Sequence, residues 1–305
     1  MEKIKILVTG ALGVIGSNLY LALKQKGHEV WGLDIIPSND ENIYECSVAS
    51  FMELKKIFEK HQFDYVYHLA ASFGRKRGED RYENLWNSNA VGTKNIIRLQ
   101  EQYKFKLIFA SSSEIYGDYK GVMHENIPFM YPIQQQNDYA CSKWVNEMQI
   151  RNSMTAFKTE SVIIRFFNLY GKEPFSEYRS VICKFIYKAL FNYPYTVFLN
   201  YFRTSCYIDD AVNTLCNIIN NFHSGEIYNI GGTERHDIKT ISKMILEYLK
   251  KDDSLVQYEE FDLLTTKDKN VDCSKAKHHL NHNPKITLAE GIPLTIEWMK
   301  KLYNK

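Results

Sequence analysis

The residues best suited to chemistry in this sequence are a tyrosine and a lysine four positions apart, Tyr139 and Lys143. They open a stretch with a helical pattern, DYACSKWVNEMQIRNSM, and residues four apart share one face of a helix. A nearby lysine stabilises a phenolate and so lowers the pKa of a tyrosine. Such a tyrosine can take the proton of a sugar hydroxyl while a nicotinamide accepts the hydride. Because Tyr-x-x-x-Lys also occurs by chance on ordinary helices, its meaning depends on the rest of the chain.

A second group of polar residues lies in FASSSEIYGD, residues 109–118, which begins at the end of the apolar run KLIFA, residues 106–110. Serines and a tyrosine here suit an ordinary polar turn. The carboxylate two residues before that tyrosine, Glu114, has two interpretations: a solvated loop charge, or an acid or base in a reaction. The local sequence does not decide between them.

Short β-branched runs alternate with amphipathic helical patterns through the first half of the chain. The predicted strands are IKILVTG, HEVWGLDII, DYVYHLAA, KLIFASSS and SVIIRFFNLYG, and the predicted helices between them include one long helix over residues 84–103. Elements in this order form a parallel sheet with helices on both faces. We therefore predict an α/β fold with a Rossmann-type doubly wound sheet, which binds ligands beyond the carboxyl ends of its strands.

The regular alternation stops after Gly171. The pattern there predicts a helix within residues 173–190, short strands at YTVFLN and GEIYNIGG, and a mostly helical final stretch. We expect a smaller mixed α/β C-terminal domain, formed by residues 168–203 and 231–305, that binds the substrate. The NAD-binding domain takes residues 1–167, with residues 204–230 returning to it.

The first predicted strand runs into a glycine-rich turn, TGALGVIG, that precedes a helix. Glycines at positions 10, 13 and 16 let the backbone turn tightly and approach a pyrophosphate, and the helix N-terminus offers N–H groups and a partial positive charge. A turn without a ligand is the alternative, but the strand before and the helix after are the context that a dinucleotide motif requires. About twenty residues later, Asp34 can accept hydrogen bonds from a ribose 2′-OH and repel a 2′-phosphate, which favours NAD over NADP.

Further short motifs accompany the glycine turn and the Tyr-Lys pair, in a fixed order along the chain. They are HLAA at 68–71, NAVGT at 89–93, SSSEIYG at 111–117, RFFN at 165–168, and Arg203 ahead of YIDD at 207–210. With these motifs the chain resembles the extended short-chain dehydrogenase/reductase superfamily, in its NAD-dependent nucleotide-sugar epimerase/dehydratase branch. The resemblance covers nearly the whole chain.

The resemblance implies a role for each matching residue. Tyr139 would be the base for oxidation of a sugar C4 hydroxyl, Ser112 would hydrogen-bond that oxygen, and Lys143 would hold the nicotinamide ribose and tune Tyr139. With Glu114 these residues form the expected catalytic group. The expected cofactor-binding residues are Gly10, Leu12, Gly13, Val14, Ile15, Gly16, Asp34, Ile35, Ser47, Val48, Leu69, Ala70, Ala71, Asn89, Tyr139, Lys143 and Phe166, and the expected substrate-binding residues are Ser112, Ser113, Asn168, Arg179, Val181 and Arg203.

The chain departs from the family pattern at two positions that bear on the reaction. Where dehydratases of the dTDP-glucose type place an acidic Asp beside the glutamate, this sequence has Ser113, a poor acid, and it lacks the serine-histidine pair typical of hexose 4,6-dehydratases. A Ser-Glu pair is also similar to that of GDP-mannose dehydratases and UDP-glucuronate decarboxylases. Glu114 is therefore compatible with dehydration, decarboxylation, epimerisation, or substrate positioning in an enzyme that stops at the C4 ketone.

The resemblance favours an NAD-dependent enzyme that oxidises C4 of a nucleotide-activated sugar, as in bacterial surface-polysaccharide pathways. The first expectation is a GDP-heptose or GDP-hexose 4-dehydrogenase acting on a GDP-sugar. The alternative is a nucleotide-sugar 4-epimerase or 4,6-dehydratase. A non-catalytic dinucleotide-binding sensor is a distant alternative. Such a protein is expected to lack the tyrosine or the lysine, whereas this chain has both Tyr139 and Lys143.

The composition limits the kinds of partner and the environment that we expect for this protein. A chain of 305 residues with a net charge of +2 gives no reason to expect nucleic acid or an anionic membrane. The N-terminal MEKIKILVTG lacks the features of a signal peptide, and no apolar run approaches membrane-spanning length. The six scattered cysteines favour free thiols in a reducing cytoplasm over disulfides or a metal site. From the resemblance we also expect a homodimer.

Overall fold

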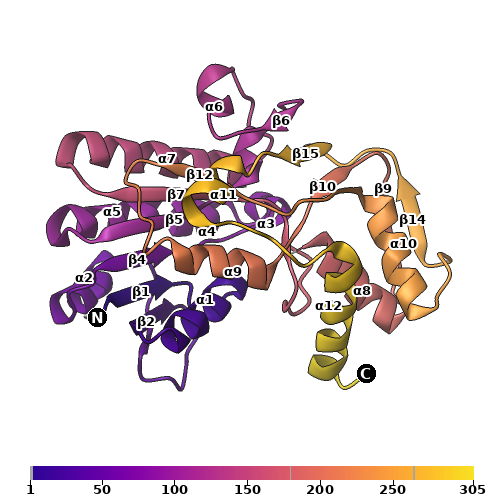
Figure 1. The fold of residues 1–305 in the computed structure, drawn as a ribbon, viewed down its shortest axis with the longest axis horizontal. Coiled ribbons are helices and arrows are strands. Elements are labelled where there is room, and N and C mark those ends of the chain that lie inside the picture. The colour runs from indigo at the N-terminus through magenta and orange to yellow at the C-terminus, as the bar shows by residue number, and fades with distance from the viewer. Residues whose placement is uncertain (1–2, 179, 264) are drawn as a thin grey trace. The chain divides into compact units, whose positions relative to one another are not determined.

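The computed structural model describes residues 3–178, 180–263 and 265–305. The chain forms two compact units (Figure 1). The first comprises residues 1–115, 137–165 and 212–228, and the second comprises residues 116–136, 166–211 and 229–305. The division predicted from sequence and the division by packing therefore differ most at residues 116–136, which the sequence pattern assigned to the first domain.

A seven-stranded sheet forms the centre of the first unit. Its strands are β1 (Lys5–Thr9), β2 (Glu29–Asp34), β3 (Ile43–Glu45), β4 (Tyr65–His68), β5 (Lys106–Ser112), β7 (Ser161–Phe166) and β12 (Ile227–Ile230), in the order β12-β7-β5-β4-β1-β2-β3. The central strands are almost wholly buried, which explains their continuous apolar runs. The strand order reverses between β1 and β4, so the predicted doubly wound sheet is confirmed and its switch point lies there.

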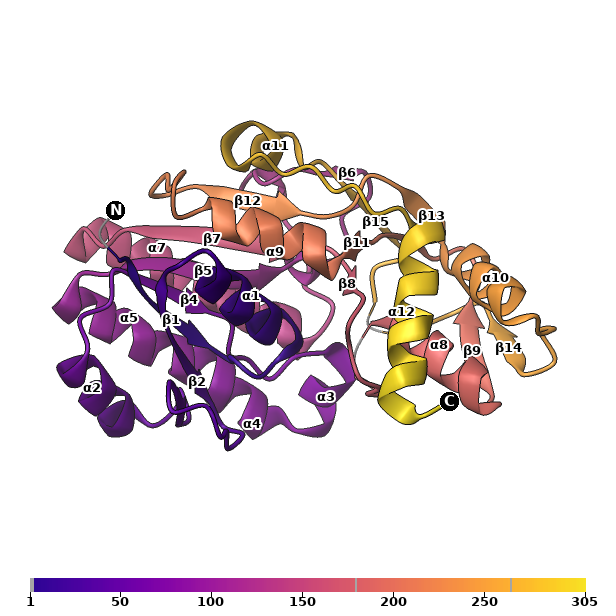
Figure 2. The same cartoon turned by 60° about the horizontal axis from the view of Figure 1, so that its bottom comes forward.

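Helices cover both faces of this sheet. Helices α2 (Phe51–Lys60), α5 (Gly92–Tyr103) and α7 (Asp138–Phe157) lie in a row on one face, and α1 (Val14–Gln25) lies on the other (Figure 2). Apolar residues of α2 and α5 pack with strand residues into one core, which includes Leu54, Phe58, Ile96 and Leu107. This apolar layer fixes where the strand ends and helix starts lie.

The single helix predicted over residues 84–103 is helical throughout, but the chain before α5 differs from it in hydrogen-bond pattern. It forms α3 (Arg75–Asp80), α4 (Tyr82–Trp86) and a π-helical turn, η1 (Asn87–Val91), that leads into α5. A π turn accommodates an extra residue and often marks a functional site, and its hydrogen-bond pattern leaves no trace in the apolar periodicity. In this protein it carries the buried side chain of Asn89.

The second unit is built from short strands and helices. A four-stranded sheet has the order β13-β10-β15-β6, formed by Arg235–Asp237, Phe202–Thr204, Asp268–Val271 and Val122–Met123. Two small two-stranded sheets pair β8 (Leu169–Tyr170) with β11 (Cys206–Tyr207) and β9 (Tyr195–Phe198) with β14 (Val256–Glu259). The helices are α6 (Ile127–Met130), α8 (Val181–Phe191), α10 (Ile238–Leu249), α11 (Ser274–Leu280) and α12 (Leu288–Tyr303), while α9 (Ile208–Asn217) begins in this unit and ends in the first.

The mostly helical final stretch predicted from sequence is only partly correct. Three strands, β13, β14 and β15, lie among the helices after residue 231. Their sequences, RHD, VQYE and DKNV, lack the apolar alternation by which a strand is detected. Pairing with neighbouring strands, rather than the local sequence pattern, makes these three segments strands.

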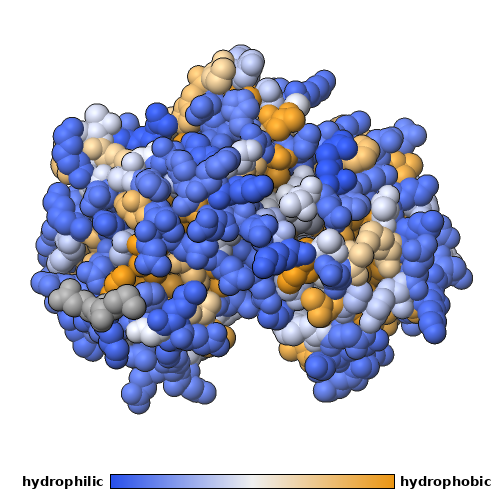
Figure 3. All heavy atoms as spheres, in the orientation of Figure 1, coloured by the Kyte–Doolittle hydropathy of each residue, from blue (hydrophilic) through white to orange (hydrophobic). Residues whose placement is uncertain are grey.

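The surface drawn in Figure 3 is mainly hydrophilic, with a few apolar groups. Several of these lie on and around α6 in the second unit, where Val122, Phe129, Met130 and Tyr131 are each 45–63% exposed. Across the described residues, no helix has both the length and the apolar character needed to cross a membrane. The six cysteines are free thiols.

Candidate active site

The glycine turn between β1 and α1 is held against the end of β4. Gly10 has a φ of +70°, and a Cβ atom there would lie 2.8 Å from the backbone nitrogen of Ala70. A Cβ atom on Gly16 would lie 2.0 Å from the carbonyl oxygen of Gly10. Both positions therefore require glycine, because any side chain would collide with backbone. The turn closes at the switch point of the sheet.

The N-terminus of α1 offers backbone donors to a ligand. Its N-cap, Gly13, makes no side-chain capping hydrogen bond, and the first turn, which includes Val14, Ile15 and Gly16, contains no acidic residue. The N–H groups of such a turn and the helix dipole suit an anion such as a pyrophosphate. The predicted phosphate cradle thus has the geometry and charge that a dinucleotide needs.

Asp34 at the end of β2 supports this turn directly. Its Oδ2 accepts a hydrogen bond from the Leu12 backbone N–H at 2.9 Å, and its Oδ1 accepts one from Ile36 at 3.2 Å. The side chain is only 8% exposed. The carboxylate that the sequence assigns to ribose recognition therefore also fixes the glycine turn, a role that its position alone does not reveal. The neighbouring Ile35 is 70% exposed.

Two further expected cofactor-binding residues, Ser47 and Val48, lie along the chain after β3. Val48 is buried, and a Cβ atom on Gly92 would lie 2.6 Å from its Cγ2. The amide of Asn95 donates to the Val48 carbonyl oxygen at 3.0 Å, and the hydroxyl of Ser47 accepts from the backbone of Ala49 at 3.2 Å. Helix α5 and a local turn thereby fix the backbone at Ser47 and Val48.

A buried histidine orders the end of β4, where Leu69, Ala70 and Ala71 follow. The Nδ1 of His68 lies 2.8 Å from the Thr9 hydroxyl, and its Nε2 lies 3.0 Å from the Thr93 hydroxyl. Burial, with a smaller contribution from Lys143, lowers the pKa of His68 to about 3. The imidazole is therefore neutral and joins β1, β4 and α5. This is a structural role rather than acid–base chemistry.

The residues with catalytic potential meet where β5 ends and α7 begins. Ser112, the last residue of β5, is hydrogen-bonded through its side chain to Tyr139, in the first turn of α7. The ammonium of Lys143, one turn further, donates to the Ala110 carbonyl oxygen at 2.7 Å and lies 5.9 Å from the centre of the Tyr139 ring. The predicted proximity of the serine, tyrosine and lysine is confirmed.

The start of α7 depends on a residue that the sequence reasoning missed. Asn137 is the N-cap, and its side-chain oxygen accepts from the Ala140 N–H at 2.9 Å. An Asn directly before an apolar helix is a standard start signal, so the sequence did contain this information. The cap fixes the first turn of the helix and with it the position of Tyr139.

The sequence predicts that Lys143 lowers the pKa of Tyr139, and in the structure this pKa is raised instead. Burial of the hydroxyl raises the pKa of Tyr139 well above its ordinary value, Glu114 raises it further, and only the hydrogen bond with Ser112 lowers it. The pKa of Lys143 is itself lowered to about 7, because its ammonium is buried. Desolvation has a larger effect on the two pKa values than the neighbouring charges have. The spacing of the residues in the sequence does not predict how strongly the two side chains are desolvated.

Glu114 lies beside this group. It is half-buried, in the 3₁₀ turn Ser113–Tyr116 that follows β5, and its Oε2 accepts from the Asn137 side-chain amide at 3.4 Å. Its charge acts on Tyr139, as the raised tyrosine pKa records. The neighbouring Ser113 is 3% exposed. The carboxylate thus belongs to the same cluster as Ser112 and Tyr139.

Asn89, expected to bind the cofactor, is fully engaged in holding the protein together. Its Oδ1 accepts from the Ser72 N–H at 2.8 Å, and its Nδ2 donates to the Ser72 carbonyl oxygen and the Ser142 hydroxyl, both at 2.9 Å. Ser142 in turn donates to the Tyr139 carbonyl oxygen at 2.8 Å. Through these bonds the π turn positions both the segment after β4 and the first turn of α7.

We expect the Asn89→Ala variant to lose about 2–3 kcal/mol of unfolding free energy, because it leaves buried polar groups of Ser72 without a partner. Urea denaturation followed by circular dichroism measures this loss. Asn87→Ala in the same π turn is the matched control, since Asn87 is exposed and its loss is expected to cost less than about 0.5 kcal/mol. Equal losses in the two variants contradict the assignment.

The other expected site residues belong to the second unit. Phe166 is 9% exposed, and Asn168 has a φ of +33° and accepts through its backbone oxygen from Cys206 at 3.2 Å. The Nη1 of Arg203 donates to the carbonyl oxygens of Phe202 and Lys267, at 2.8 and 3.0 Å. Val181 is the first residue of α8. Arg179 lies outside the described residues.

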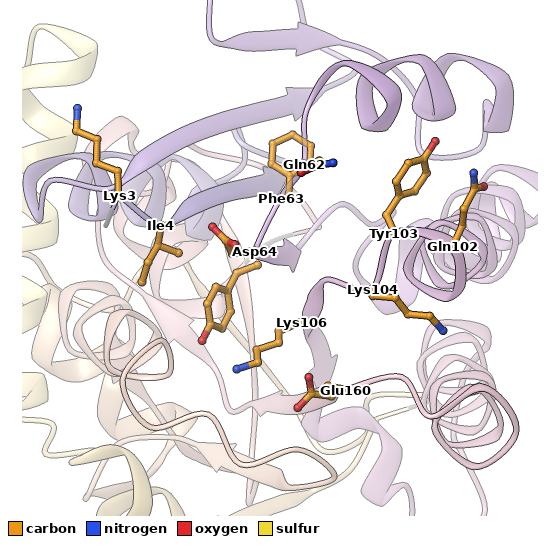
Figure 4. A pocket seen from close by; sticks show the side chains of 11 residues that line it. Lys3, Ile4, Gln62, Phe63, Asp64, Gln102, Tyr103, Lys104, Lys106 and Glu160 are labelled. Atoms are coloured by element: carbon orange, nitrogen blue, oxygen red, sulfur yellow. The ribbon is translucent and has the colours of Figure 1, made fainter. Parts of the chain in front are cut away.

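A groove of about 970 Å³ lies at the opposite edge of the main sheet (Figure 4). Its lining includes Ile4, Asp64 and Lys106, which stand at or just before the amino ends of β1, β4 and β5. The glycine turn and Tyr139 instead lie at the carboxyl ends. The groove is therefore separate from the candidate active site.

Known proteins resemble this chain over its full length. Residues 6–231 match the model of the "NAD dependent epimerase/dehydratase family". A UDP-N-acetyl-alpha-D-glucosaminuronate decarboxylase of Bacillus cytotoxicus is 27% identical over 99% of both chains, and a UDP-glucuronate 4-epimerase of Thermodesulfobacterium geofontis is 29% identical over 97% of this chain and 96% of its own. The structure of UDP-glucuronic acid 4-epimerase from Bacillus cereus with UDP-glucuronic acid and NAD superposes with a TM-score of 0.87 at 25% identity, covering 98% of this chain and all of the other.

These relatives carry UDP-sugars in their names, and none of them carries a GDP-sugar. They support the epimerase or dehydratase alternative better than the expected GDP-heptose or GDP-hexose 4-dehydrogenase. The glycine turn that no side chain could occupy, the open helix N-terminus and Asp34 together fit the cofactor of the family. The protein is therefore an NAD-dependent enzyme of the epimerase/dehydratase family.

Proposed function

We propose that the protein is an NAD-dependent 4-epimerase of a UDP-activated sugar. The observation that carries this proposal is the hydrogen bond between Ser112 and Tyr139, with the Lys143 ammonium 5.9 Å from the tyrosine ring. The three groups lie at the carboxyl ends of the strands, where such sheets bind ligands. A phenol, a hydroxyl and an ammonium in this arrangement can take a proton from a sugar hydroxyl and return it.

Each residue has one task in this reaction. Tyr139, as the phenolate, takes the proton of the C4 hydroxyl, while the Ser112 hydroxyl orients the C4 oxygen and Lys143 would hold the nicotinamide ribose. NAD, when bound, would supply the acceptor and the donor of the C4 hydride. Tyr139 returns the proton to the C4 oxygen after the opposite face of the ketone has been reduced, so that neither protons nor electrons are lost overall.

The cofactor and substrate would be held by the residues already described. The first-turn N–H groups of α1 and the carboxylate of Asp34 suit the pyrophosphate and ribose of NAD. For the nucleotide sugar we propose Asn168, Val181 and Arg203 of the second unit as binding residues. The chain is proposed to act as a homodimer that pairs through α5 and α7, where Val91, just before α5, and Met148 on α7 are 47% and 41% exposed.

The proposed substrate is a UDP-sugar because the named relatives act on UDP-sugars and match this chain almost end to end. The test is to incubate the purified protein and NAD separately with UDP-glucose, UDP-glucuronic acid and GDP-mannose and to follow the sugars by NMR. We expect a C4 epimer from one UDP-sugar and none from the GDP-sugar. Turnover of the GDP-sugar alone, or a C4 ketone that accumulates with NADH, would show the proposal to be wrong.

A second candidate reaction rests on Glu114. A half-buried carboxylate beside Tyr139 could remove the C5 proton once C4 is a ketone, which leads to dehydration or inversion at C5. Turnover in deuterated water distinguishes the reactions. Deuterium at C5 or a loss of one water indicates this second reaction, whereas an epimer without deuterium at C5 supports simple 4-epimerisation.

We expect the Glu114→Gln variant to keep its activity but to shift its pH profile. The charge of Glu114 raises the pKa of Tyr139, so its removal lowers that pKa, and the limb where activity rises with pH moves to lower pH by about one unit. The measurement is kcat/KM from pH 7 to the highest pH at which the protein stays folded. Glu83→Gln, at an exposed residue of α4, is the matched control and is expected to leave the profile in place.

A further inference from the structure

The first unit contains a fully buried ion pair between Glu147, one helical turn after Lys143 on α7, and Arg165 on β7. The Nε of Arg165 on β7 donates to Oε1 of Glu147 on α7 at 3.0 Å, and its Nη2 donates to Oε2 at 2.7 Å. Both side chains are 0% exposed. The Ser111 hydroxyl on β5 donates to the same Oε1. One carboxylate thus joins a helix to two neighbouring strands.

This cluster adjoins the candidate catalytic residues on both elements that carry them. Glu147 lies four residues, about one helical turn, after Lys143, so the two side chains share one face of α7. Ser111 directly precedes Ser112 on β5. The Lys143 ammonium is anchored on the same strand, by its hydrogen bond to the Ala110 carbonyl oxygen.

Burial opposes the charge of Lys143. The side chain is 3% exposed, and burial lowers its pKa to about 7. The Ala110 carbonyl and the Phe109 ring, 4.9 Å from the ammonium, are uncharged, and His68 from β4 is neutral. Tyr139 on α7 is uncharged until it gives up its proton and becomes the base. Glu147 is the group whose charge raises the pKa of Lys143, and its carboxylate is held by the Arg165 guanidinium.

We propose that Glu147, fixed in place by Arg165 and Ser111, is a positioning residue that keeps Lys143 protonated in its buried place beside Tyr139. Replacing a buried ion pair by apolar side chains of similar volume often leaves stability unchanged or higher, so stability alone does not explain one at this position. A carboxylate held by donors on two strands keeps a constant position. It therefore acts on Lys143 without competing for the substrate. The inference rests on the proposed catalytic role of the Tyr139–Lys143 pair.

The direct test is the titration of Lys143 in the full-length protein, observed by NMR with 13C-labelled lysine and assigned with the Lys143→Arg variant. In Glu147→Gln, which keeps the shape of the side chain, the Lys143 pKa is expected to fall by about one pH unit or more. Ser111→Ala removes one hydrogen bond and no charge, and its Lys143 pKa is expected to stay near that of the wild type. An unchanged titration in Glu147→Gln overturns the proposal.

Glu147→Gln leaves the Arg165 charge buried without its partner and can therefore fold poorly. The double variant Glu147→Met, Arg165→Met removes both charges at similar volume, and the Lys143 pKa is again expected to fall. Glu101→Gln is the matched control. Its carboxylate on α5 accepts from Ser153 of α7 at 2.9 Å, ten residues or about 15 Å beyond Lys143, and the titration is expected to be unchanged. A double variant that folds and titrates like the wild type also overturns the proposal.

The pH dependence of turnover separates this inference from the proposed reaction. Once a substrate is known, Glu147→Gln is expected to lose activity on the alkaline side about one pH unit earlier than the wild type, because Lys143 gives up its proton sooner. A shifted Lys143 titration without turnover of any tested nucleotide sugar would refute the proposed substrate and leave the positioning role intact. Normal turnover with an unshifted alkaline limb and an unshifted titration would refute the positioning role alone.

Discussion

Replacing Tyr139 with Phe is expected to lower kcat about 10²- to 10⁴-fold, the range over which a positioned acid or base contributes to a reaction. The variant loses only the hydroxyl that is hydrogen-bonded to Ser112. The ring and the packing of the first turn of α7 remain, so the fold should persist. NAD binding, measured by calorimetry, should change little, because the cradle formed by Gly10, Gly13 and Gly16 is untouched.

Tyr82→Phe is the control for this substitution. Tyr82 lies on α4 in the same unit and is 52% exposed, so loss of its hydroxyl is expected to leave kcat unchanged. If Tyr139→Phe converts the true substrate as fast as the wild type does, Tyr139 is not the acid–base residue. The distant alternative, a dinucleotide-binding sensor without catalysis, would then be favoured.

The second large effect is expected at the glycine turn. Gly16→Ala places a Cβ atom 2.0 Å from the Gly10 carbonyl oxygen and 2.8 Å from its carbonyl carbon, and no flexible side chain is there to yield. The turn must open or α1 must move away from β1. We expect a loss of about 2–3 kcal/mol in unfolding free energy, typical of an overpacked site, and at least about a tenfold loss in NAD affinity.

Ser17→Ala, one residue further along α1, tests whether the effect belongs to the turn. Ser17 is half-buried and makes only a 3.5 Å contact with the Val14 carbonyl oxygen. Alanine is a better helix former, so stability and NAD affinity are expected to be maintained. Thermal unfolding and calorimetric titration with NAD measure both quantities. Wild-type NAD affinity in Gly16→Ala would mean that the cofactor does not use this turn.

Much of the cofactor half of the site could be predicted because its requirements are local. Glycine at positions 10 and 16 is imposed by backbone contacts within a few residues and across one strand, and the turn follows a strand and precedes a helix. The Tyr139–Lys143 spacing places two groups on one helix face whatever surrounds the helix. Such features survive in the sequence as fixed spacings, and the structure reproduces them.

Other features depend on partners distant in the sequence and could not be predicted. The π turn that carries Asn89 is set by hydrogen bonds to Ser72 and Ser142, which lie 17 and 53 residues away. The strands β13 and β15 exist because β10 pairs with both. Periodicity in apolar residues carries no information about such partners.

The sequence by itself determined the chemical groups of this protein: a dinucleotide turn, a tyrosine with a lysine one helical turn away, and the strand-helix order that brings them to one edge of a sheet. The tertiary structure alone decided the electrostatic state of those groups. Burial raises the pKa of Tyr139 and lowers that of Lys143 because the fold removes water from both, and the charge of Glu147, which is paired with Arg165, raises the pKa of Lys143. Burial depends on all the elements that pack around a residue, whereas spacing depends on the chain alone.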